Sequence, residues 1–285
     1  MKSKKMILLP IKISREKNYK SFMISKFFQL LFISTIIVVT PNITLAQKTL
    51  ELGVFAGGSY YLGDINPALH FNQTQLAYGG VARYNLSHRW TVKGSFYHGK
   101  VKGDDKLTNA VANRELNFLT RINDISIVAE FSWFDYFTGS KRSYFTPYIF
   151  AGVSYFMFKP KAIDGTELQP LGTEGQNTGF EGRKPYSLSS LALPFGIGVK
   201  YSINSRLGLA FEWGLRKTLT DYIDDVSTTY YEGSISDPYS DPTASHEAGM
   251  QRGDSSKNDW YGFTGITLTY KFDLSDKTKC NTSSY

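Results

Sequence analysis

The sequence predicts an all-β protein, an eight-stranded antiparallel transmembrane β-barrel with short periplasmic turns and long extracellular loops. Two segments between residues 187 and 221 alternate large apolar residues with small or polar ones in a strict period of two. Six further segments repeat this pattern, and the connections between the eight alternate between short and long. Alternation gives a strand one apolar and one polar face, which is the pattern that a barrel in a bilayer needs on every strand.

The first 46 residues are expected to be a cleaved signal peptide. A basic stretch precedes an apolar run from Phe27 to Val39, and Thr44 and Ala46 then offer small side chains at the two positions that a signal peptidase reads. The run is too short for a comfortable membrane-spanning helix. An uncleaved anchor is the alternative, and Met23 is an alternative start to Met1.

The charge of the chain changes once this leader is removed. The whole chain has 32 Lys and Arg against 25 Asp and Glu, and residues 1–46 hold eight of the basic residues and one of the acidic ones. The mature chain therefore has 24 of each, so its net charge is near zero and we expect no nucleic-acid partner. Aromatic residues make up 15% of the chain, a share usual for a barrel with aromatic girdles.

Eight strands are expected after residue 46. Each supplies the roughly 9–11 residues that a tilted membrane strand needs, and a single-chain bacterial barrel requires an even number. In chain order they cover residues 49–62, 76–86, 89–103, 119–134, 144–159, 187–203, 206–221 and 259–273. The barrel domain thus spans residues 47–273, and residues 274–285 form a polar periplasmic tail.

The connections between these strands alternate in length. Short or compact connections are expected at residues 85–88, 135–143 and 204–205, and longer ones at 63–75, 104–118, 160–186 and 221–258. In outer-membrane barrels the short turns face the periplasm and the long loops face outward. Eight strands with this alternation place both termini in the periplasm.

The polar faces of the strands carry charges of both signs. The residues expected inside the barrel are Glu51, Lys93, Glu130, Lys200, Glu212 and Arg216. Charges at membrane depth are expected to pair with one another, and eight strands enclose a space that side chains fill. We therefore predict a structural salt-bridged plug rather than an ion path. The faces of the strand at 144–159 stay open, because large residues occupy both.

No residue pattern points firmly to catalysis or metal binding. The four histidines have no partner at metal-ligand spacing. A Ser–His–Asp site built from Ser95, His98 and Asp104 is conceivable from residue types alone. Aspartates between residues 221 and 241 lack calcium-loop spacing, and residues 252–254 match an adhesion tripeptide. We expect no enzymatic activity, no cofactor and no metal.

Several longer phrases of the sequence carry a family resemblance. They are residues 57–67, 168–176, 194–201, 212–218, 221–230 and 257–261. Together they resemble the PorG-like family of outer-membrane barrels, which is associated with the type IX secretion system and the gliding machinery. The resemblance covers nearly the whole mature chain, from about Leu50 to Phe272.

This resemblance implies a component of a Gram-negative outer membrane, surrounded by outer-membrane lipid. It would contact the periplasmic ring made by a lipoprotein and its partner, and it brings no catalytic residues. The family-like residues in the expected outward loops are Gly63, Asp64, Asn66, Pro67, Gly172, Glu174, Asp224 and Asp225. Because these residues face away from a periplasmic contact, we hypothesise that the loops fold over the barrel mouth and plug it. The alternative function is a narrow outer-membrane channel or a small-solute-binding barrel.

Overall fold

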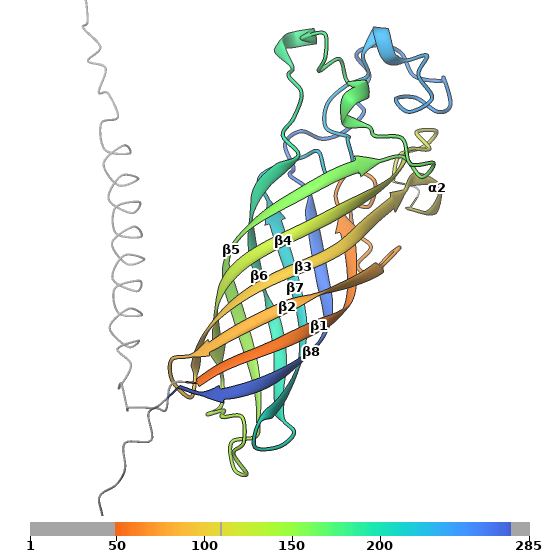
Figure 1. Ribbon diagram of the computed structural model, residues 1–285. Coiled ribbons are helices and arrows are strands. Elements are labelled where there is room, and N and C mark those ends of the chain that lie inside the picture. The colour runs from red at the N-terminus through yellow and green to blue at the C-terminus, as the bar shows by residue number, and fades with distance from the viewer. Residues whose placement is uncertain (1–48, 109, 275–285) are drawn as a thin grey trace, which may run out of the picture. The chain divides into compact units, whose positions relative to one another are not determined.

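The computed structural model of this chain describes residues 49–108 and 110–274 (Figure 1). The expected signal peptide at residues 1–46 lies outside them, as does the expected tail apart from Leu274. Among the described residues, no helix has both the length and the apolar character needed to cross a membrane.

Eight strands close into one antiparallel barrel in which each strand pairs with its neighbours in the sequence. This confirms the predicted fold, and every expected strand lies within a few residues of an observed one. The strands are β1 (Thr49–Leu62), β2 (Gln75–Asn85), β3 (Trp90–Asp104), β4 (Asn117–Ser132), β5 (Phe145–Lys161), β6 (Ser189–Ser202), β7 (Leu207–Thr218) and β8 (Trp260–Asp273).

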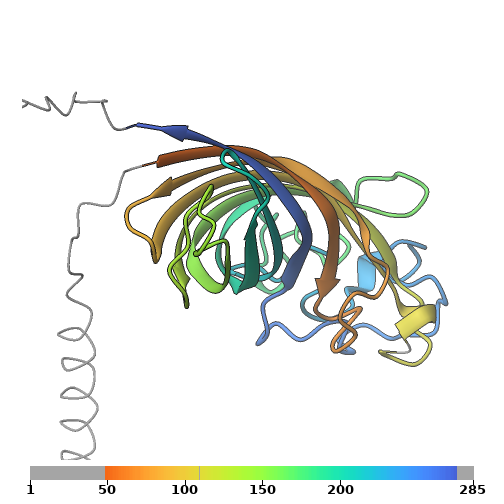
Figure 2. The same cartoon turned by 90° about the horizontal axis from the view of Figure 1, so that it is seen from below.

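Pairing between the first and last strands closes the barrel. β1 and β8 run antiparallel over the full length of β1, from the Thr49–Asp273 pair to the Leu62–Trp260 pair. Closure leaves no strand edge with unpaired backbone groups, which a bilayer would not tolerate. Figure 2 views the barrel from the end at which β1 begins and β8 ends.

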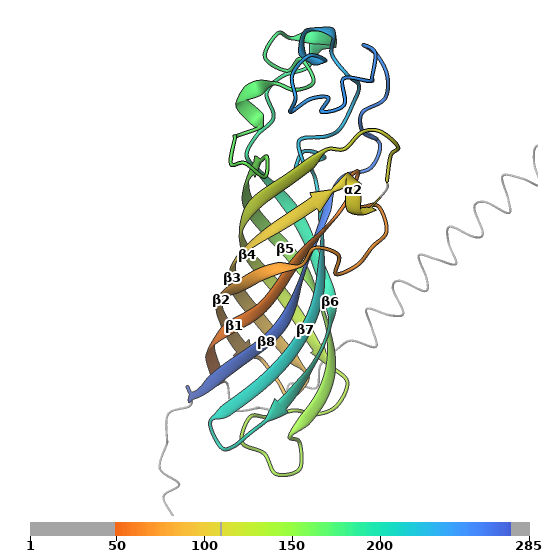
Figure 3. The same cartoon turned by 90° about the vertical axis from the view of Figure 1, so that its right-hand side faces the viewer.

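The two ends of the barrel differ in their connections (Figures 1 and 3). At one end, the turn end, lie the short connections 86–89, 133–144 and 203–206 together with Thr49 and Asp273. The other end, the loop end, carries connections 63–74, 105–116, 162–188 and 219–259. Among their described residues, these loops contain four short helical turns: α2 (Asp105–Thr108), η1 (Gln169–Leu171), η2 (Phe180–Gly182) and η3 (Glu232–Ser234).

The outer face of the barrel is apolar, as the alternation predicts. Val54 and Ile127 are each about three-fifths exposed, whereas the inward-facing side chains next to them along their strands are buried. The strand left open by the sequence, β5, follows the same rule: Ile149 and Val153 face outward, and Tyr148 faces inward. A barrel exterior of this kind is the surface that lipid requires.

The interior is not polar throughout. A cluster of apolar and aromatic side chains fills the half of the barrel toward the loop end, including Phe55, Tyr97 and Phe263. The Phe55 and Tyr97 rings lie 4.4 Å apart, and Phe263 meets Tyr97 edge-on at 5.2 Å. The cluster continues into the loops through Ile65 and Ile223, so barrel and loops share one core.

Candidate functional site

Five charged side chains from five strands form one ion-pair network across the barrel interior. One oxygen of Glu130 lies 3.2 Å from Arg83 Nε and 3.4 Å from Lys93 Nζ. The other oxygen lies 2.6 Å from Lys200 Nζ. Glu212 lies 2.8 Å from Arg83 Nη2 and also contacts Lys93. Because all five side chains are buried, the network fills this cross-section of the barrel.

Four members of this network, Lys93, Glu130, Lys200 and Glu212, are predicted from the sequence, and Arg83 was missed. Tyr78 and Tyr84 of β2 point outward, so the alternation of the strand places Arg83, the neighbour of Tyr84, inside the barrel. The period-two pattern of that strand therefore contained the signal. Arg83 contacts both glutamates, so it joins the two halves of the network.

Glu51 lies inside the barrel but outside the ion-pair network. It accepts hydrogen bonds from Thr138 Oγ1 at 2.7 Å and from Asn85 Nδ2 at 3.0 Å. Thr138 belongs to the 133–144 turn, and its carbonyl accepts a 2.7 Å hydrogen bond from Lys271 Nζ. Thr138 and Tyr136 are both buried, so this turn folds into the opening at the turn end.

Arg216 also lies apart from the network, toward the loop end. Its guanidinium stacks over Phe263 at 4.6 Å and lies 5.5 Å from the Tyr97 ring. The nearest carboxylate, Asp124, is 4.0 Å away and accepts a hydrogen bond from Tyr261. Aromatic faces therefore supply much of the stabilisation that the sequence assigned to an acidic partner.

The loops are joined by a second buried polar cluster, centred on Glu174. Its Oε1 accepts hydrogen bonds from the Ser227 amide at 2.9 Å and from Arg252 Nη1 at 3.0 Å. Its Oε2 accepts from the hydroxyl of Thr228 at 2.6 Å. Arg252 Nη1 also donates to the Asp225 carbonyl at 2.6 Å. These bonds tie the 162–188 loop to the 219–259 loop.

Arg114 extends the ties to the two remaining loops. It donates two 2.7 Å hydrogen bonds to the carboxylate of Asp105 within its own loop. Its Nη1 donates to the carbonyl of Arg252 at 2.7 Å, and its Nη2, which also bonds Asp105, donates to the carbonyl of Asp64 at 2.8 Å. All four long connections therefore meet through two buried arginines. We call this assembly the loop cap, and it lies beyond the strands in Figure 3.

The loop cap is anchored in the barrel mouth. Thr120, an inward residue of β4, donates a 2.6 Å hydrogen bond to the Ile223 carbonyl. The Tyr61 hydroxyl of β1 lies 2.5 Å from Asp224 Oδ2 and 2.6 Å from Asp259 Oδ1. One hydroxyl has a single proton, so the second contact requires a protonated carboxyl.

Burial of these carboxyls agrees with that requirement. Desolvation, followed by the charge of Asp64, raises the pKa of Asp224 to about 8. Desolvation and the charge of Asp224 raise the pKa of Asp259 well above its usual range. Asp221 is also buried, and desolvation raises its pKa to about 9. The loop cap therefore holds protonated carboxyls at neutral pH.

The family-like loop residues have structural roles in this cap. Gly63 approaches Tyr61 so closely that a Cβ there would lie 2.1 Å from its hydroxyl oxygen. Asn66 is buried and donates 2.7 and 2.9 Å hydrogen bonds to the carbonyls of Tyr61 and Leu69. Gly172 ends η1 with a left-handed φ of 63°, a conformation that glycine adopts at no steric cost. Asp225 accepts hydrogen bonds from Thr173 and Tyr186.

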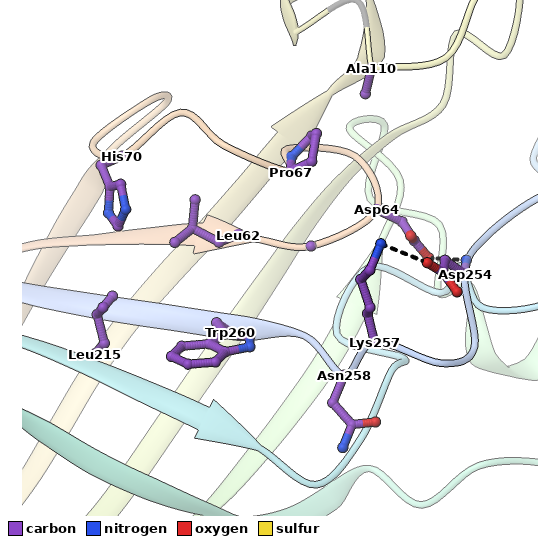
Figure 4. A pocket seen from close by; sticks show the side chains of 11 residues that line it. Leu62, Asp64, Pro67, His70, Ala110, Leu215, Asp254, Lys257, Asn258 and Trp260 are labelled. Atoms are coloured by element: carbon purple, nitrogen blue, oxygen red, sulfur yellow. Dashed lines mark hydrogen bonds and ion pairs between the residues drawn. The ribbon is translucent and has the colours of Figure 1, made fainter.

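Pro67 lines a groove of about 600 Å³ on the outer rim of the loop end (Figure 4). Its lining includes the outward residues Leu62 and Trp260, and the loop residues Asp254 and Lys257 form a 2.9 Å ion pair beside it. Apolar strand residues below and charged loop residues above are expected where a barrel leaves the lipid. The groove brings together no nucleophile and base.

The conceivable Ser–His–Asp site is not assembled. Ser95 points inward, with its hydroxyl 2.7 Å from that of Ser126, whereas His98 points outward, with Nδ1 2.7 Å from Asn123 Oδ1. The adhesion tripeptide is also unavailable, because Arg252 is buried in the loop cap. Within residues 49–108 and 110–274, no group of three or more His, Cys, Asp or Glu side chains is arranged to hold a metal ion.

The sequence pattern of one protein family, described as a domain of unknown function (DUF6089), matches residues 29–281. The chain belongs to this family. No curated protein matches the sequence of this DUF6089 protein. The family match covers all eight strands and the loop cap, so barrel and cap belong to one family unit.

Several solved barrels are similar to this DUF6089 protein. Ail, the attachment invasion locus protein of Yersinia pestis, shows 12% identity and a TM-score of 0.41, covering 79% of this chain and 99% of its own. The outer membrane protein OprG from Pseudomonas aeruginosa shows 16% identity and a TM-score of 0.38, with coverages of 80% and 96%. The N-terminal barrel domain of Pseudomonas aeruginosa OprF shows 15% identity and a TM-score of 0.36, covering 79% of this chain and 98% of its own. The fold assignment rests on the closed strand pairing itself, and no function is taken from these similarities.

Proposed function

We propose that this protein is a non-enzymatic outer-membrane barrel of the PorG-like kind, which anchors or assembles the periplasmic ring of the type IX secretion machinery. The observation that carries this proposal is that both ends of the barrel are sealed by buried polar contacts. The 133–144 turn is held in one opening by Glu51 and Lys271. The loop cap, centred on Glu174 and Arg252, covers the other. A sealed barrel suits a scaffold better than a conduit or an enzyme.

The turn end offers the surface for a periplasmic partner, because short turns face the periplasm in such barrels. A groove of about 460 Å³ lies between the 133–144 and 203–206 turns. Its lining includes Tyr144 and Tyr201, whose rings meet edge-on at 5.7 Å. Exposed tyrosines are favourable contact residues, because they bury large area at low entropic cost. Lys141 in the same lining supplies an exposed charge at the rim.

Deleting the gene tests the role in secretion. We expect export of proteins that carry the type IX sorting domain to stop and to return when the wild-type gene is supplied. A Tyr144→Ala/Tyr201→Ala variant should assemble in the outer membrane but restore export poorly. A Phe71→Ala/Leu171→Ala variant removes exposed apolar residues at the loop end and is the matched control. Normal export in the deletion strain would exclude this role.

Planar bilayers test the alternative function, a narrow channel or small-solute binder. The ion pairs of Arg83 with Glu130 and Glu212 cross the barrel interior and are buried, so we expect no discrete conductance steps from the purified barrel. Reproducible single-channel steps that persist after repurification would favour the channel.

A further inference from the structure

The outer surface of the barrel carries a basic patch at one place. Lys100 of β3, Arg121 of β4 and Lys159 of β5 occupy one row, because Lys100 pairs with Arg121 and Arg121 pairs with Lys159 in the strand register. Lys102 and Lys161 lie in the next row toward the loop end, on either side of Leu119. We call these five residues, Lys100, Lys102, Arg121, Lys159 and Lys161, the basic patch.

All five side chains point away from the lumen. Their immediate neighbours along the strands, including Val101, Thr120 and Phe158, are buried inside the barrel. Since successive strand residues point to opposite faces, the basic side chains lie on the outside. Elsewhere on the eight described strands, Lys217 is the single outward-facing basic residue. The patch is therefore confined to one side of the barrel.

The position of the patch along the strands places it at a membrane boundary. Trp90, whose ring lies 5.0 Å from that of Phe131, marks the apolar rim at the turn end. Lys100 follows Trp90 by ten residues along β3, which at ~3.3 Å per residue and a tilt of about 40° is a height of about 25 Å. That height is about the thickness of the apolar band of an outer-membrane barrel. If the protein spans the outer membrane as proposed, the row lies at the outer-leaflet interface.

The rows below the patch change from polar to apolar in the expected order. His98 and Asn123 form a hydrogen-bonded pair directly below Lys100 and Arg121. The next row contains Phe96, Ile125 and Tyr155, all of which are close to half exposed. A molecule with an anionic head and apolar chains would therefore meet complementary surface along its whole length.

The charges of the patch are only partly balanced by the protein. Glu167 lies 2.6 Å from Lys159 Nζ and 3.3 Å from Lys161 Nζ. Among the described residues, no carboxylate lies within 4.0 Å of Lys100 or Arg121. Like charges placed directly opposite on neighbouring strands destabilise a sheet, so an external anion beside Lys100 and Arg121 would stabilise this row.

We propose that the basic patch binds the phosphate groups of a phosphorylated glycolipid in the outer leaflet, whose acyl chains lie along the apolar rows below. This inference rests on the outer-membrane placement in the proposed function but not on the role in secretion. The planar guanidinium of Arg121 is suited to bidentate phosphate contact, Lys100 beside it acts as a point charge, and Lys159 on the other side shares its charge with Glu167. Exposure of about half of the Lys159 side chain leaves it accessible.

The test measures binding of lipid A to the purified full-length barrel in phosphatidylcholine nanodiscs. The test variant is Lys100→Gln/Arg121→Gln/Lys159→Gln, and the control Lys141→Gln/Arg142→Gln/Lys184→Gln removes three exposed charges elsewhere. Each basic side chain at an anionic lipid surface contributes about a fivefold factor in affinity. We therefore expect binding to weaken on the order of 100-fold in the test variant and to be unchanged in the control. A heat-dependent gel shift verifies that both variants are folded barrels.

Two further arms distinguish the lipid chemistry. Lipid A without its phosphates should bind as weakly to the wild type as intact lipid A binds to the test variant. Phosphatidylglycerol should bind more weakly than lipid A, and inorganic phosphate at equal concentration should not compete. Equal lipid A binding by wild type and test variant would overturn the proposal, as would equal binding of phosphatidylglycerol. Membrane fractionation tests the outer-membrane placement separately, so failure there is distinguishable from failure of lipid binding.

Discussion

Individual buried side chains of this protein often depend on one partner that is far away in the sequence. Tyr61 is 163 residues from Asp224 and 198 from Asp259, yet it contacts both. The contact joins the rim of the barrel to the loop cap through two hydrogen bonds, one of which requires a protonated carboxyl. Gly63 permits it, because any side chain at that position would displace the Tyr61 hydroxyl. This close approach explains why a glycine directly follows β1.

The raised carboxyl pKa values make the loop cap sensitive to alkaline pH. The pKa values of Asp224 and Asp221, about 8 and about 9, exceed the ordinary carboxyl value of about 4. Between these values the folded cap binds more protons than the opened cap. The contribution of these two carboxyls to the stability of the folded loop cap is therefore complete below about pH 4, and it is lost as the pH rises through 8 and 9.

We expect proteinase K to cleave the 219–259 loop faster at pH 9.5 than at pH 6, after correction with an unfolded peptide substrate. Asp221→Asn removes one of the titrating groups and should reduce the difference between the two pH values. Glu181→Gln, at an exposed carboxylate, is the control and should leave it unchanged. Equal protection of the wild-type loop at both pH values would contradict this reading.

At the scale of elements, strands and loops use different means of holding together. The strands are held by a continuous backbone ladder closed between β1 and β8. The four long connections are joined instead by buried side-chain contacts of Glu174, Arg114 and Arg252. Loss of one arginine should therefore loosen the loops and leave the ladder intact.

Arg252→Met tests this separation. It leaves Glu174 and Asp225 buried without their cation, and removing one member of a buried ion pair costs about 3–5 kcal/mol. We expect rapid proteolysis of the 219–259 loop but an unchanged heat-dependent gel shift of the barrel. Lys257→Met is the matched control, because Lys257 is 80% exposed and should have no effect. A wild-type rate of proteolysis in Arg252→Met would show that other contacts hold the cap.

Element positions followed closely from the sequence, because the period of two is a local property. The observed β7 ends at Thr218 rather than near 221, since the chain then turns inward and Ile223 bonds to Thr120 in the barrel mouth. The faces of β5 could not be assigned locally, because Tyr148 and Ile149 are both large. The structure buries Tyr148 over Lys200 at 4.6 Å, a contact that depends on the neighbouring strands.

At the scale of the whole molecule, the barrel is a closed unit with a filled interior. A charged network lies in its middle, an aromatic core lies toward the loop end, and the 133–144 turn closes the turn end. The network holds three cations, Arg83, Lys93 and Lys200, against two glutamates. Its charge balance therefore depends on both carboxylates.

Glu212→Gln should destabilise the whole barrel. It leaves Arg83 and Lys93 with one carboxylate to share, at a cost of about 3–5 kcal/mol for a buried pair. We expect a lower urea midpoint for unfolding from lipid vesicles, followed by tryptophan fluorescence. Arg83→Met leaves equal numbers of cations and anions in the network, so it should lower the urea midpoint less than Glu212→Gln does. The exposed-site variant Lys141→Gln should match the wild type, and an unchanged midpoint in Glu212→Gln would mean that the network adds little stability.

Local alternation in the sequence is enough to predict the strands, their number, their outward apolar faces and the inward position of charges such as Lys93 and Glu212. These follow from alternation along a single strand, which needs no knowledge of its neighbours. The folded barrel is needed to show which inward charges meet, how Arg83 contacts both glutamates and how Glu174 reaches Arg252 across 78 residues. It also aligned Lys100, Arg121 and Lys159 on the outside. These contacts and alignments depend on the register of the strands and on the paths of the loops. Register and loop paths are fixed by contacts between distant segments rather than by any local pattern.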